Sequence, residues 1–428
     1  MNPVIKRIEE RYLALCNSHL EHPTKVSFRD HLNTLGPSFY ATFLPDHLAV
    51  VLEYSVLCNQ LRTNMNALSQ ENKERVIQQL RAALMLAEFL EHIHRHYLVV
   101  PREVERFRQH QFLYRELLSD LSGQSFSETI AAANPDWTVS QRIRVFTAEN
   151  NWYRLLFVRA KRLFDMIDVV NQNAGVFGQF VFILDKATDP IVPYLGWCFL
   201  LPRLLSNLFF TFKHVIPGSW MDEKEAAVDW QTRFWAQMQR RWFELANDST
   251  GVAVGLINCF FLTGALAPSA LVLSITFFAF DVSTAAIRAY IELTRLAALE
   301  SEYINQLQTE TNDDNQNAIN DYLQHLTKRI DFENRRFTIN VGAITAIFIS
   351  MLFLIPAFAV HPVIPFIGAV LLVIITLANF ILMNELEKTR PQDEVQRPSN
   401  LSNLGFFARN QPAKESDQPA YTNEILCN

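Results

Sequence analysis

Apolar positions form two long runs that no charged residue interrupts. The first run lies between Asp248 and Asp281, and the second lies between Arg336 and Glu385. A helix of about 20 apolar residues crosses the hydrocarbon core of a bilayer, which is roughly 30 Å thick. The second run is long enough for two such helices, so it predicts two membrane spans joined by a turn.

The second run contains its own turn. Pro362 and Pro365 lack a backbone donor and disfavour helix in the residue before them. We therefore predict spans over 338–359 and 364–384. The alternative is a buried helical hairpin in a soluble protein. The sequence disfavours it, because core helices seldom run so far without a charge.

The first run is too long for one span and short for two. Pro268 supplies a break, so we predict a hairpin with arms over 251–266 and 269–289. Asp281 then lies near the cytoplasmic interface. A single tilted and kinked helix is the alternative.

A third apolar stretch, 191–212, is ambiguous because it contains Pro202 and Arg203. The favoured interpretation is a re-entrant or interfacial hairpin. The alternative is a true span in which Arg203 is paired inside a bundle. The stretch that follows, 229–246, is amphipathic with two tryptophans on one face, and predicts either an interfacial helix or a helix docked on the soluble domain.

The remaining sequence predicts helices throughout. The 3.6-residue period is clearest between Arg75 and Tyr97, where one face is apolar: Val76, Leu80, Leu84, Ala87 and Leu90. Residues 290–336 show heptad-like spacing on both sides of a polar turn at 309–317, which predicts an antiparallel helical hairpin.

These patterns predict an all-α, multi-pass membrane protein with an N-terminal helical cytoplasmic domain and a helical-hairpin stalk. The predicted units are an all-α cytoplasmic domain (1–170), an apolar re-entrant or interfacial region with an amphipathic helix (171–250), a transmembrane hairpin (251–289), the cytoplasmic helical hairpin (290–336), a second transmembrane hairpin (337–384) and a disordered tail (385–428).

Composition agrees with a membrane protein. Of 428 residues, 49% are hydrophobic and 19% are charged, whereas a soluble chain has about a quarter charged residues. The net charge of −6 gives no basic signature for nucleic acid. The five cysteines form no C-x-x-C pair, so they predict neither a disulfide framework nor a zinc site. No cofactor is expected.

Charge placement predicts the orientation in the membrane. Lysines and arginines occupy the loops beside the predicted hairpins and the tail, whereas the hairpin tips have none. The positive-inside rule then puts both termini on the cytoplasmic side. The basic cluster of Arg159, Lys161 and Arg162 agrees if 191–212 does not span. The membrane is a bacterial inner membrane or, for a translocated effector, a host organelle membrane.

Candidate chemistry is sparse. One helix end gathers possible metal ligands: Glu88, Glu91, His92, His94 and His96. A di-iron site in a helical bundle needs two Glu-x-x-His motifs and two further carboxylates, and only one such motif is present. A solvated, histidine-rich helix end is therefore the favoured interpretation. No catalytic motif is present either, which favours a non-enzymatic protein over a membrane-embedded hydrolase or transferase.

Polar residues at membrane depth are candidates for function, and three stand out: Asp281, Arg203 and His361. Asp281 and Arg203 could pair across a bundle, as in a proton or ion path. The favoured interpretation places both at the interface with their charges in water.

The tail from 385 to 428 is rich in Pro, Ser, Asn, Gln and acidic residues, and ends with Ile425 and Leu426 close to its terminus. This composition resembles the C-terminal signals of effectors exported by Dot/Icm-type IVB secretion systems of intracellular bacteria. The resemblance implies insertion into a host organelle membrane, with the helical domain exposed to host cytosol.

The function expected from the sequence is that of a non-enzymatic scaffold or interaction protein. The bilayer and a protein that binds the helical domain are the expected partners, and the oligomeric state is left open. The alternative is a channel or transporter that uses Asp281 and Arg203.

Overall fold

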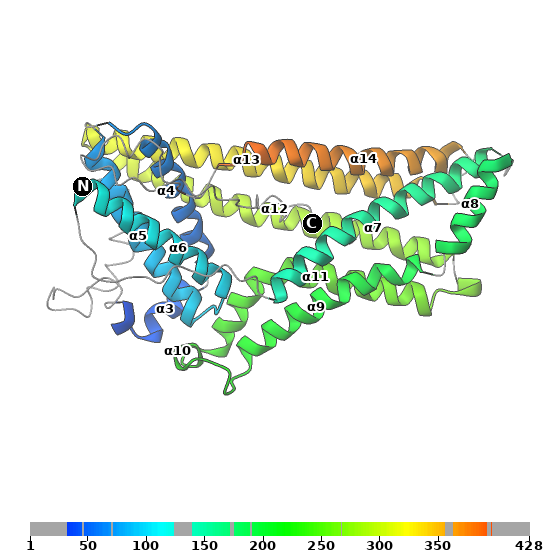
Figure 1. Cartoon of the computed structure of the whole chain (residues 1–428), viewed down its shortest axis with the longest axis horizontal. Coiled ribbons are helices and arrows are strands. Elements are labelled where there is room, and N and C mark those ends of the chain that lie inside the picture. Colours follow the sequence, from blue (N-terminus) through cyan, green and yellow to red (C-terminus); the bar gives the residue numbers. More distant parts are fainter. Residues whose placement is uncertain are drawn as a thin grey trace, which may run out of the picture.

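The molecule is an elongated assembly of helices. The computed structural model describes residues 32–44, 47–69, 72–123, 139–171, 175–188, 191–266, 268–355, 363–391 and 395. Within these ranges 88% of the residues are helical and none lies in a strand. A group of short helices forms one end of the molecule, and long helices run side by side to the other end (Figure 1).

The helices have the following bounds: α3 (Pro37–Phe43), α4 (His47–Asn66), α5 (Lys73–His96), α6 (Pro101–Ser122), α7 (Val139–Val170), α8 (Gly175–Thr188), α9 (Val192–Val215), α10 (Glu223–Ala226), α11 (Trp230–Phe260), α12 (Ser269–Thr309), α13 (Asp313–Leu352) and α14 (Val363–Lys388). A short 3-10 turn, η1 (Gly264–Leu266), lies between α11 and α12.

The N-terminal domain consists of α3 to α6. The apolar face predicted for α5 is buried over its whole length, from Val76 to Leu90. Pro101 occupies the first turn of α6, where its missing N–H costs nothing. Gly123 ends the same helix in the left-handed conformation, with φ of 69°. The α5 and α6 helices pack along each other and on α4, and together they bury the main part of the core.

The residues predicted to form a helical hairpin, 290–336, lie in two packed helices. The α12 and α13 helices pack along each other, and α13 begins after Asn312, whose side chain accepts hydrogen bonds from the N–H groups of Asp314 and Asn315. Each helix continues without interruption into an apolar segment. We call the part of this pair between 290 and 336 the stalk.

The stalk and the N-terminal domain share one hydrophobic core. Tyr303 and Tyr322 of the stalk are fully buried, with ring centroids 4.3 Å apart, in the same cluster as the side chains of α4 to α6. Val228 and Ala236, at the start of α11, belong to this cluster too. The domain is therefore fixed to the stalk by packing rather than attached by a flexible linker.

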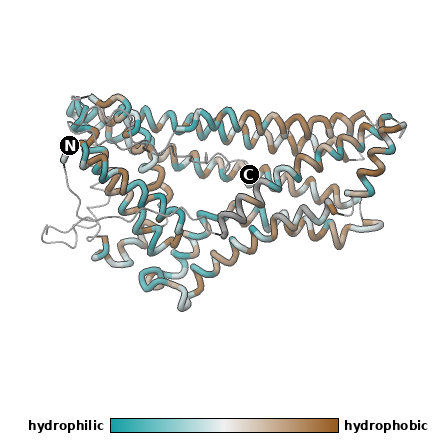
Figure 2. The backbone as a smooth tube through the Cα atoms, in the orientation of Figure 1, coloured by the Kyte–Doolittle hydropathy of each residue, from teal (hydrophilic) through white to brown (hydrophobic). Residues whose placement is uncertain are grey.

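Six long helices form a closed bundle. Each packs on two neighbours, in the cyclic order α7, α9, α11, α12, α13, α14 and back to α7. Hydropathy changes along the length of the molecule (Figure 2). The end that holds the N-terminal domain and the stalk tip contains both hydrophilic and hydrophobic residues, and the opposite half of the bundle is predominantly apolar.

Three helices of the bundle are long and apolar enough to cross a membrane. They are α12, α13 and α14, with mean hydropathies of 1.9, 1.2 and 2.7 in their most apolar 18 residues. Only 11% of that stretch is buried in α12, and 28% in each of the other two. Apolar surface exposed to this extent marks a contact with lipid or with another protein, and the three helices are consistent with a membrane protein.

The predicted first arm, over 251–266, differs from the structure. The α11 helix begins at Trp230 and ends at Phe260, so its uncharged C-terminal part is too short to cross a bilayer alone. The second arm and both arms of the later hairpin correspond to α12, α13 and α14. The third apolar stretch, 191–212, forms the continuous helix α9, which passes through Pro202 and packs along α11.

The sequence placed α7 in the N-terminal domain (1–170), but the structure places it in the bundle. This helix packs on α14 and α9 rather than with α4 to α6. Arg162 Nη1 lies 3.2 Å from Met351 Sδ, near the end of α13 that is remote from the stalk. Arg162 of the basic cluster therefore lies at the end of the bundle opposite the stalk.

Candidate functional site

The two carboxylates of the candidate metal cluster on α5 are held by arginines. Glu88 accepts a hydrogen bond of 2.6 Å from Arg115 Nη2. Glu91 pairs with Arg95 one turn later on the same helix, and Arg108 Nε lies 3.4 Å from it. Carboxylates paired in this way are not presented as ligands to a metal.

The three histidines of that cluster contact different partners, although the His92 and His96 ring centroids lie 4.6 Å apart. The His92 ring stacks on Tyr40 with centroids 4.9 Å apart. The Nδ1 atom of His94 is 2.8 Å from a backbone carbonyl oxygen one turn earlier, and burial lowers the pKa of His94 to about 3. His96 Nδ1 lies 2.9 Å from a carboxylate oxygen of Asp222. Within the described part of the chain, no group of three or more His, Cys, Asp or Glu could hold a metal ion.

The pairing of Arg203 with Asp281, which the sequence left as an alternative, is not seen in the bundle. Arg203 binds Asp248, and Arg159 is the cation that acts electrostatically on Asp281. His361 lies outside the described residues.

Arg203 and Asp248 form the most specific contact in the seam between α9 and α11. The guanidinium donates from Nε to both carboxylate oxygens, at 3.0 Å and 2.8 Å, and from Nη2 to Oδ1. The Asp248 side chain is fully buried, and that of Arg203 is 13% exposed. A two-point contact of this kind fixes both the orientation and the register of the two helices.

The contact belongs to an antiparallel register that extends along the seam. One turn toward the N-terminal domain, Asn207 Nδ2 donates to Glu244 Oε2 over 3.0 Å. In the other direction, an added Cβ on Gly251 would lie 2.6 Å from Leu200, so the absence of a side chain lets the helices approach. One seam therefore combines a close helix contact with buried polar pairs, as helix pairs in membranes do.

Gly255 extends the close contact by one further turn. A Cβ at this position would lie 2.7 Å from Trp197 Cβ, which is part of a side chain that cannot move aside without moving its helix. Gly251 and Gly255 are four residues apart and therefore lie on one face of α11.

A second polar contact lies within the closed bundle. Arg159 of α7 donates from Nη1 to the hydroxyl oxygen of Thr376, near the middle of α14. The carboxylate of Asp281, on α12, stabilises the positive charge of Arg159, whereas Arg154 and Arg162 oppose it. Because α7 and α12 are not neighbours in the cyclic order, this attraction acts across the bundle.

Charges also gather where α7 meets α8. Lys161 Nζ lies 2.5 Å from Asp185 Oδ1 and 3.4 Å from Asp165 Oδ2. The two carboxylates compensate the charge of Lys161, so these three residues have no excess of positive charge.

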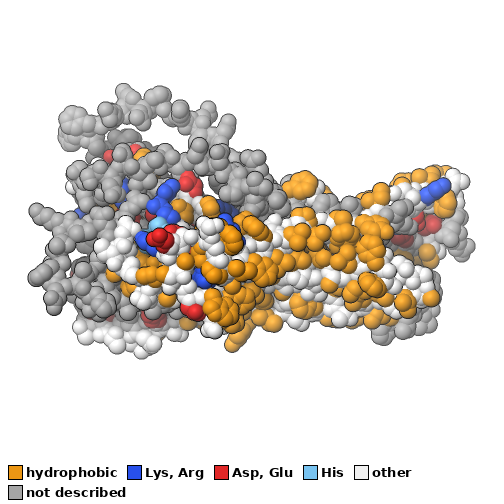
Figure 3. All heavy atoms as spheres, turned by 90° about the horizontal axis from the view of Figure 1, so that it is seen from below, with side chains coloured by type: hydrophobic (Ala, Val, Ile, Leu, Met, Phe, Trp, Pro, Cys, Tyr) orange, Lys and Arg blue, Asp and Glu red, His pale blue; other side chains and the backbone are white. Residues whose placement is uncertain are grey.

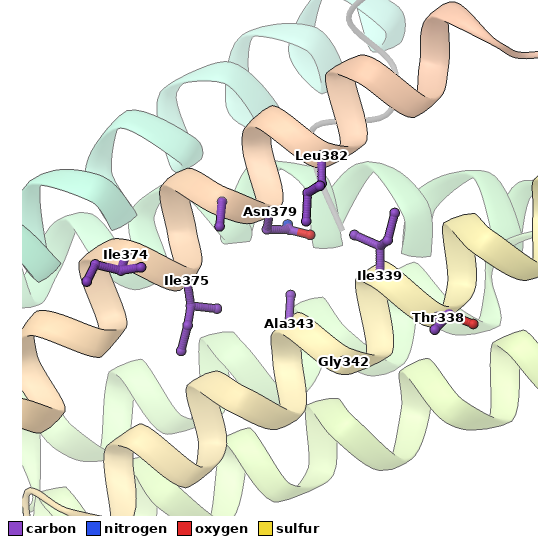
Figure 4. Close-up of a pocket in the computed structure, with 9 residues that line it drawn as sticks. Thr338, Ile339, Gly342, Ala343, Ile374, Ile375, Asn379 and Leu382 are labelled. Atoms are coloured by element: carbon purple, nitrogen blue, oxygen red, sulfur yellow. The ribbon is translucent and has the colours of Figure 1, made fainter.

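The bundle has a shallow groove between α13 and α14, with a volume of about 250 Å³. Its lining is apolar except for Thr338 and Asn379, and Asn379 points from α14 toward α13 (Figure 4). The groove brings together no nucleophile, acid or base. It therefore gives no support to the hydrolase or transferase alternative.

Three polar contacts supplement the apolar core between α4 and the stalk. Tyr303 donates a hydrogen bond of 2.8 Å to Glu53, whose side chain is fully buried. Gln60 Nε2 donates to Asp321 over 2.7 Å. His325 Nδ1 lies 2.7 Å from the amide oxygen of Asn59, which gives the third contact. These directional contacts set one orientation of the domain on the stalk.

Sequence reasoning missed Asp248, Glu244 and the two glycines of the α9–α11 seam. A usable signal was present, because the acidic pair and the glycine pair each repeat at a spacing of four residues on one helix face. The residues that contact this face of α11 lie on α9, far earlier in the chain. No local pattern in the sequence identifies them.

Comparison with known proteins gives no match. No protein-family model matches the chain, and neither a curated protein nor a solved structure matches it. Conclusions about function therefore rest on the contacts described above.

Proposed function

We propose that this chain is an integral membrane scaffold that holds its N-terminal helical domain in a fixed orientation beside the bilayer, where a protein partner binds it. The observation that carries the proposal is the core shared by the domain and the stalk. A domain that is packed onto a membrane-inserted hairpin has a defined distance and angle to the lipid, which a flexible tether does not provide.

The cyclic order of the bundle supports a topology for this scaffold. Three helices are apolar enough to span on their own, and α7, α9 and α11 would cross beside them with their charges turned toward other helices. The six helices alternate in direction. The N-terminal domain and the end of α14 would therefore lie on one side of the membrane, as the sequence led us to expect.

Site-specific photocrosslinking tests the scaffold proposal in native membranes. A photoreactive residue is placed in the full-length protein at Phe112, which is exposed on α6, and separately at Gln109 on the same helix. We expect both positions to form an adduct with the same protein. A matched label at Leu377, exposed on the apolar helix α14, should not form it. The proposal is wrong if neither α6 position gives an adduct that Leu377 lacks.

A second candidate function is the passage of an ion or a proton through the bundle. The attraction between Arg159 and Asp281, which come from opposite helices, favours it. Asp281→Asn should then abolish flux in reconstituted vesicles. Ser283→Ala, a change at an exposed position on the same helix, should leave it intact. Absence of flux through the unaltered protein would dismiss this candidate.

The membrane in which the protein acts is a separate proposal. The composition of the C-terminal tail supports export as an effector and insertion into a host organelle membrane. A translocation reporter fused to residues 385–428 tests it. Failure of the tail to direct export from a bacterium with an intact secretion system would leave a bacterial membrane as the location.

A further inference from the structure

The α9 helix has a face on which large apolar side chains are exposed. Four large residues repeat along it at helical spacing: Leu205, Phe209, Phe212 and Ile216. Each is between 51% and 62% exposed. The opposite face of the same helix packs on α11 through buried Leu204 and through the polar seam. The exposed stripe is therefore a second, distinct surface of α9.

Three exposed tryptophans lie in the segment that follows α9. Trp220 lies in the connection that leads to α10, and Trp230 and Trp235 lie in the first turns of α11. Their exposed fractions are 56%, 55% and 61%. Exposing three indoles in water is unfavourable, because each presents a large apolar ring.

The Trp220 indole is held in place rather than loosely attached. Its Nε1–H donates to the carbonyl oxygen of Lys213 over 2.9 Å. A Cβ on Gly218 would lie 2.4 Å from its ring, so the chain passes directly against the indole. The loop is thus built around an aromatic ring that remains more than half exposed.

The surface lies between two regions of different character. It begins on α9 beside the apolar bundle and ends next to the N-terminal domain, where His96 contacts Asp222. Hydrophobic side chains gather over the bundle and continue toward that domain in the space-filling view (Figure 3). The boundary between hydrocarbon and water around a membrane protein is where tryptophan is enriched.

We propose that the α9–α11 arm, defined as residues 205–235, is embedded in the interfacial layer of the leaflet nearest the N-terminal domain, with the four residues of the α9 stripe and the three tryptophans in contact with lipid. The inference deepens the proposed scaffold function and rests on its membrane assignment. The arm extends the membrane contact of α9 and α11 into the interfacial layer, and it prevents the domain from tilting.

Two features identify lipid as the occupant rather than a protein. The α9 stripe lies on a helix of the apolar bundle, and the seven side chains are all aliphatic or aromatic. The charges of residues 205–235 nearly balance, because the basic residues Lys213, Lys224 and Arg233 are offset by the acidic residues Asp222, Glu223, Glu225 and Asp229. We therefore expect the arm to insert equally well into zwitterionic and anionic membranes.

Spin labels in nanodiscs test the proposal with the full-length protein. The accessible cysteines are replaced by serine and buried Cys58 is kept. Single cysteines are then introduced in separate variants: Trp220→Cys, Trp230→Cys, Trp235→Cys, Phe112→Cys and Leu377→Cys. Collision rates with oxygen, which partitions into lipid, and with a water-soluble nickel chelate give the depth of each label in phosphatidylcholine.

We expect the three arm labels to lie at headgroup depth, between the aqueous Phe112 label and the deep Leu377 label. Addition of anionic lipid should not change their depth. Arm labels as accessible to nickel as the Phe112 label would overturn the proposal. Labels shielded from both reagents would overturn it too, because they would indicate a protein occupant, including a second copy. If the Leu377 label is also aqueous, the membrane assignment itself fails.

Discussion

The N-terminal domain and the apolar bundle solve the same packing problem in opposite ways. In the domain, large apolar side chains such as Leu80 and Phe107 are fully buried. In the bundle, Val272 and Ile381 are more than half exposed, while Asp248 is fully buried. The difference is consistent with water around the domain and lipid around the bundle. Water drives apolar groups inward, whereas lipid accepts them at the surface and drives charges into pairs.

Disrupting the Arg203–Asp248 pair should cause the largest loss of stability in the bundle. Asp248→Ala removes the carboxylate from a guanidinium in a poorly hydrated seam, and breaking a buried pair in this way costs about 3–5 kcal/mol. We expect the reconstituted protein to unfold at much lower denaturant concentration. Ser249→Ala, at the exposed neighbouring position, is the matched control.

The double variant Arg203→Leu with Asp248→Leu separates charge pairing from packing. Because both charges are removed together, most of the lost stability should return. A single variant Asp248→Ala as stable as the unaltered protein would mean that the seam is open to water, which contradicts the contrast between the two regions.

Acid should weaken the domain before the bundle. Burial lowers the pKa of His47 and of His94 from 6.5 to about 3. Both histidines are therefore neutral in the folded protein, and their contribution to the free energy of unfolding is complete above pH 6.5. This contribution is lost as the pH falls toward 3, because the histidines of the unfolded chain bind protons first. At pH 5 each histidine lowers the free energy of unfolding by about 2 kcal/mol.

Hydrogen exchange measured between pH 7 and pH 5 tests this expectation region by region. Amides of α4 and α5 should lose protection, while those of α14 should not. The variant His47→Asn with His94→Asn should reduce the pH dependence. Equal loss of protection in α5 and α14 would contradict the account.

The two kinds of glycine in the bundle sharpen the comparison further. Gly255→Ala places a Cβ 2.7 Å from Trp197 and forces α9 and α11 apart, whereas a Cβ at Gly342 meets nothing within 4 Å. We expect Gly255→Ala to cost about 1–3 kcal/mol, the usual range for overpacking. Gly342→Ala should be neutral or slightly stabilising, because alanine favours helix. Denaturation of both variants in lipid measures the difference in stability. Equal effects would contradict the close contact between α9 and α11 at Gly255.

The smallest expected effect is at the contact between the domain and the stalk. Tyr303→Phe deletes the hydrogen bond to Glu53 and leaves the apolar contacts intact. The expected cost is about 1 kcal/mol, because the shared core remains. Faster hydrogen exchange confined to α4 would show it. Tyr290→Phe, at a position that is 72% exposed, is the control and should have no effect.

Much of the fold could be predicted, because α12, α13 and α14 carry apolar runs and a polar turn that are visible locally. The bundle helix α7 could not. Its Arg154, Arg159 and Arg162 interrupt the hydropathy, and the groups that accommodate them include Asp281 and Thr376, more than a hundred residues away. A hydropathy scale scores each residue independently of its contacts, whereas the energetic cost of a charge in lipid depends on its partner.

The candidate site shows the same limit. Asp281 and Arg203 were both identified from the sequence as intramembrane polar residues, yet each has a different partner in the structure. A single sequence shows that a charge needs compensation, but the helix that supplies it depends on the tertiary arrangement. The weak metal-ligand candidates on α5 show a similar dependence on tertiary contacts, because Arg95 and Arg115 hold the two carboxylates.

Fractionation of native membranes tests the central claim, that lipid surrounds α12, α13 and α14, most directly. We expect the full-length protein to remain in the pellet after alkaline carbonate extraction, and to enter solution only with detergent. A protein that is released by carbonate and stays monodisperse in plain buffer would contradict the account.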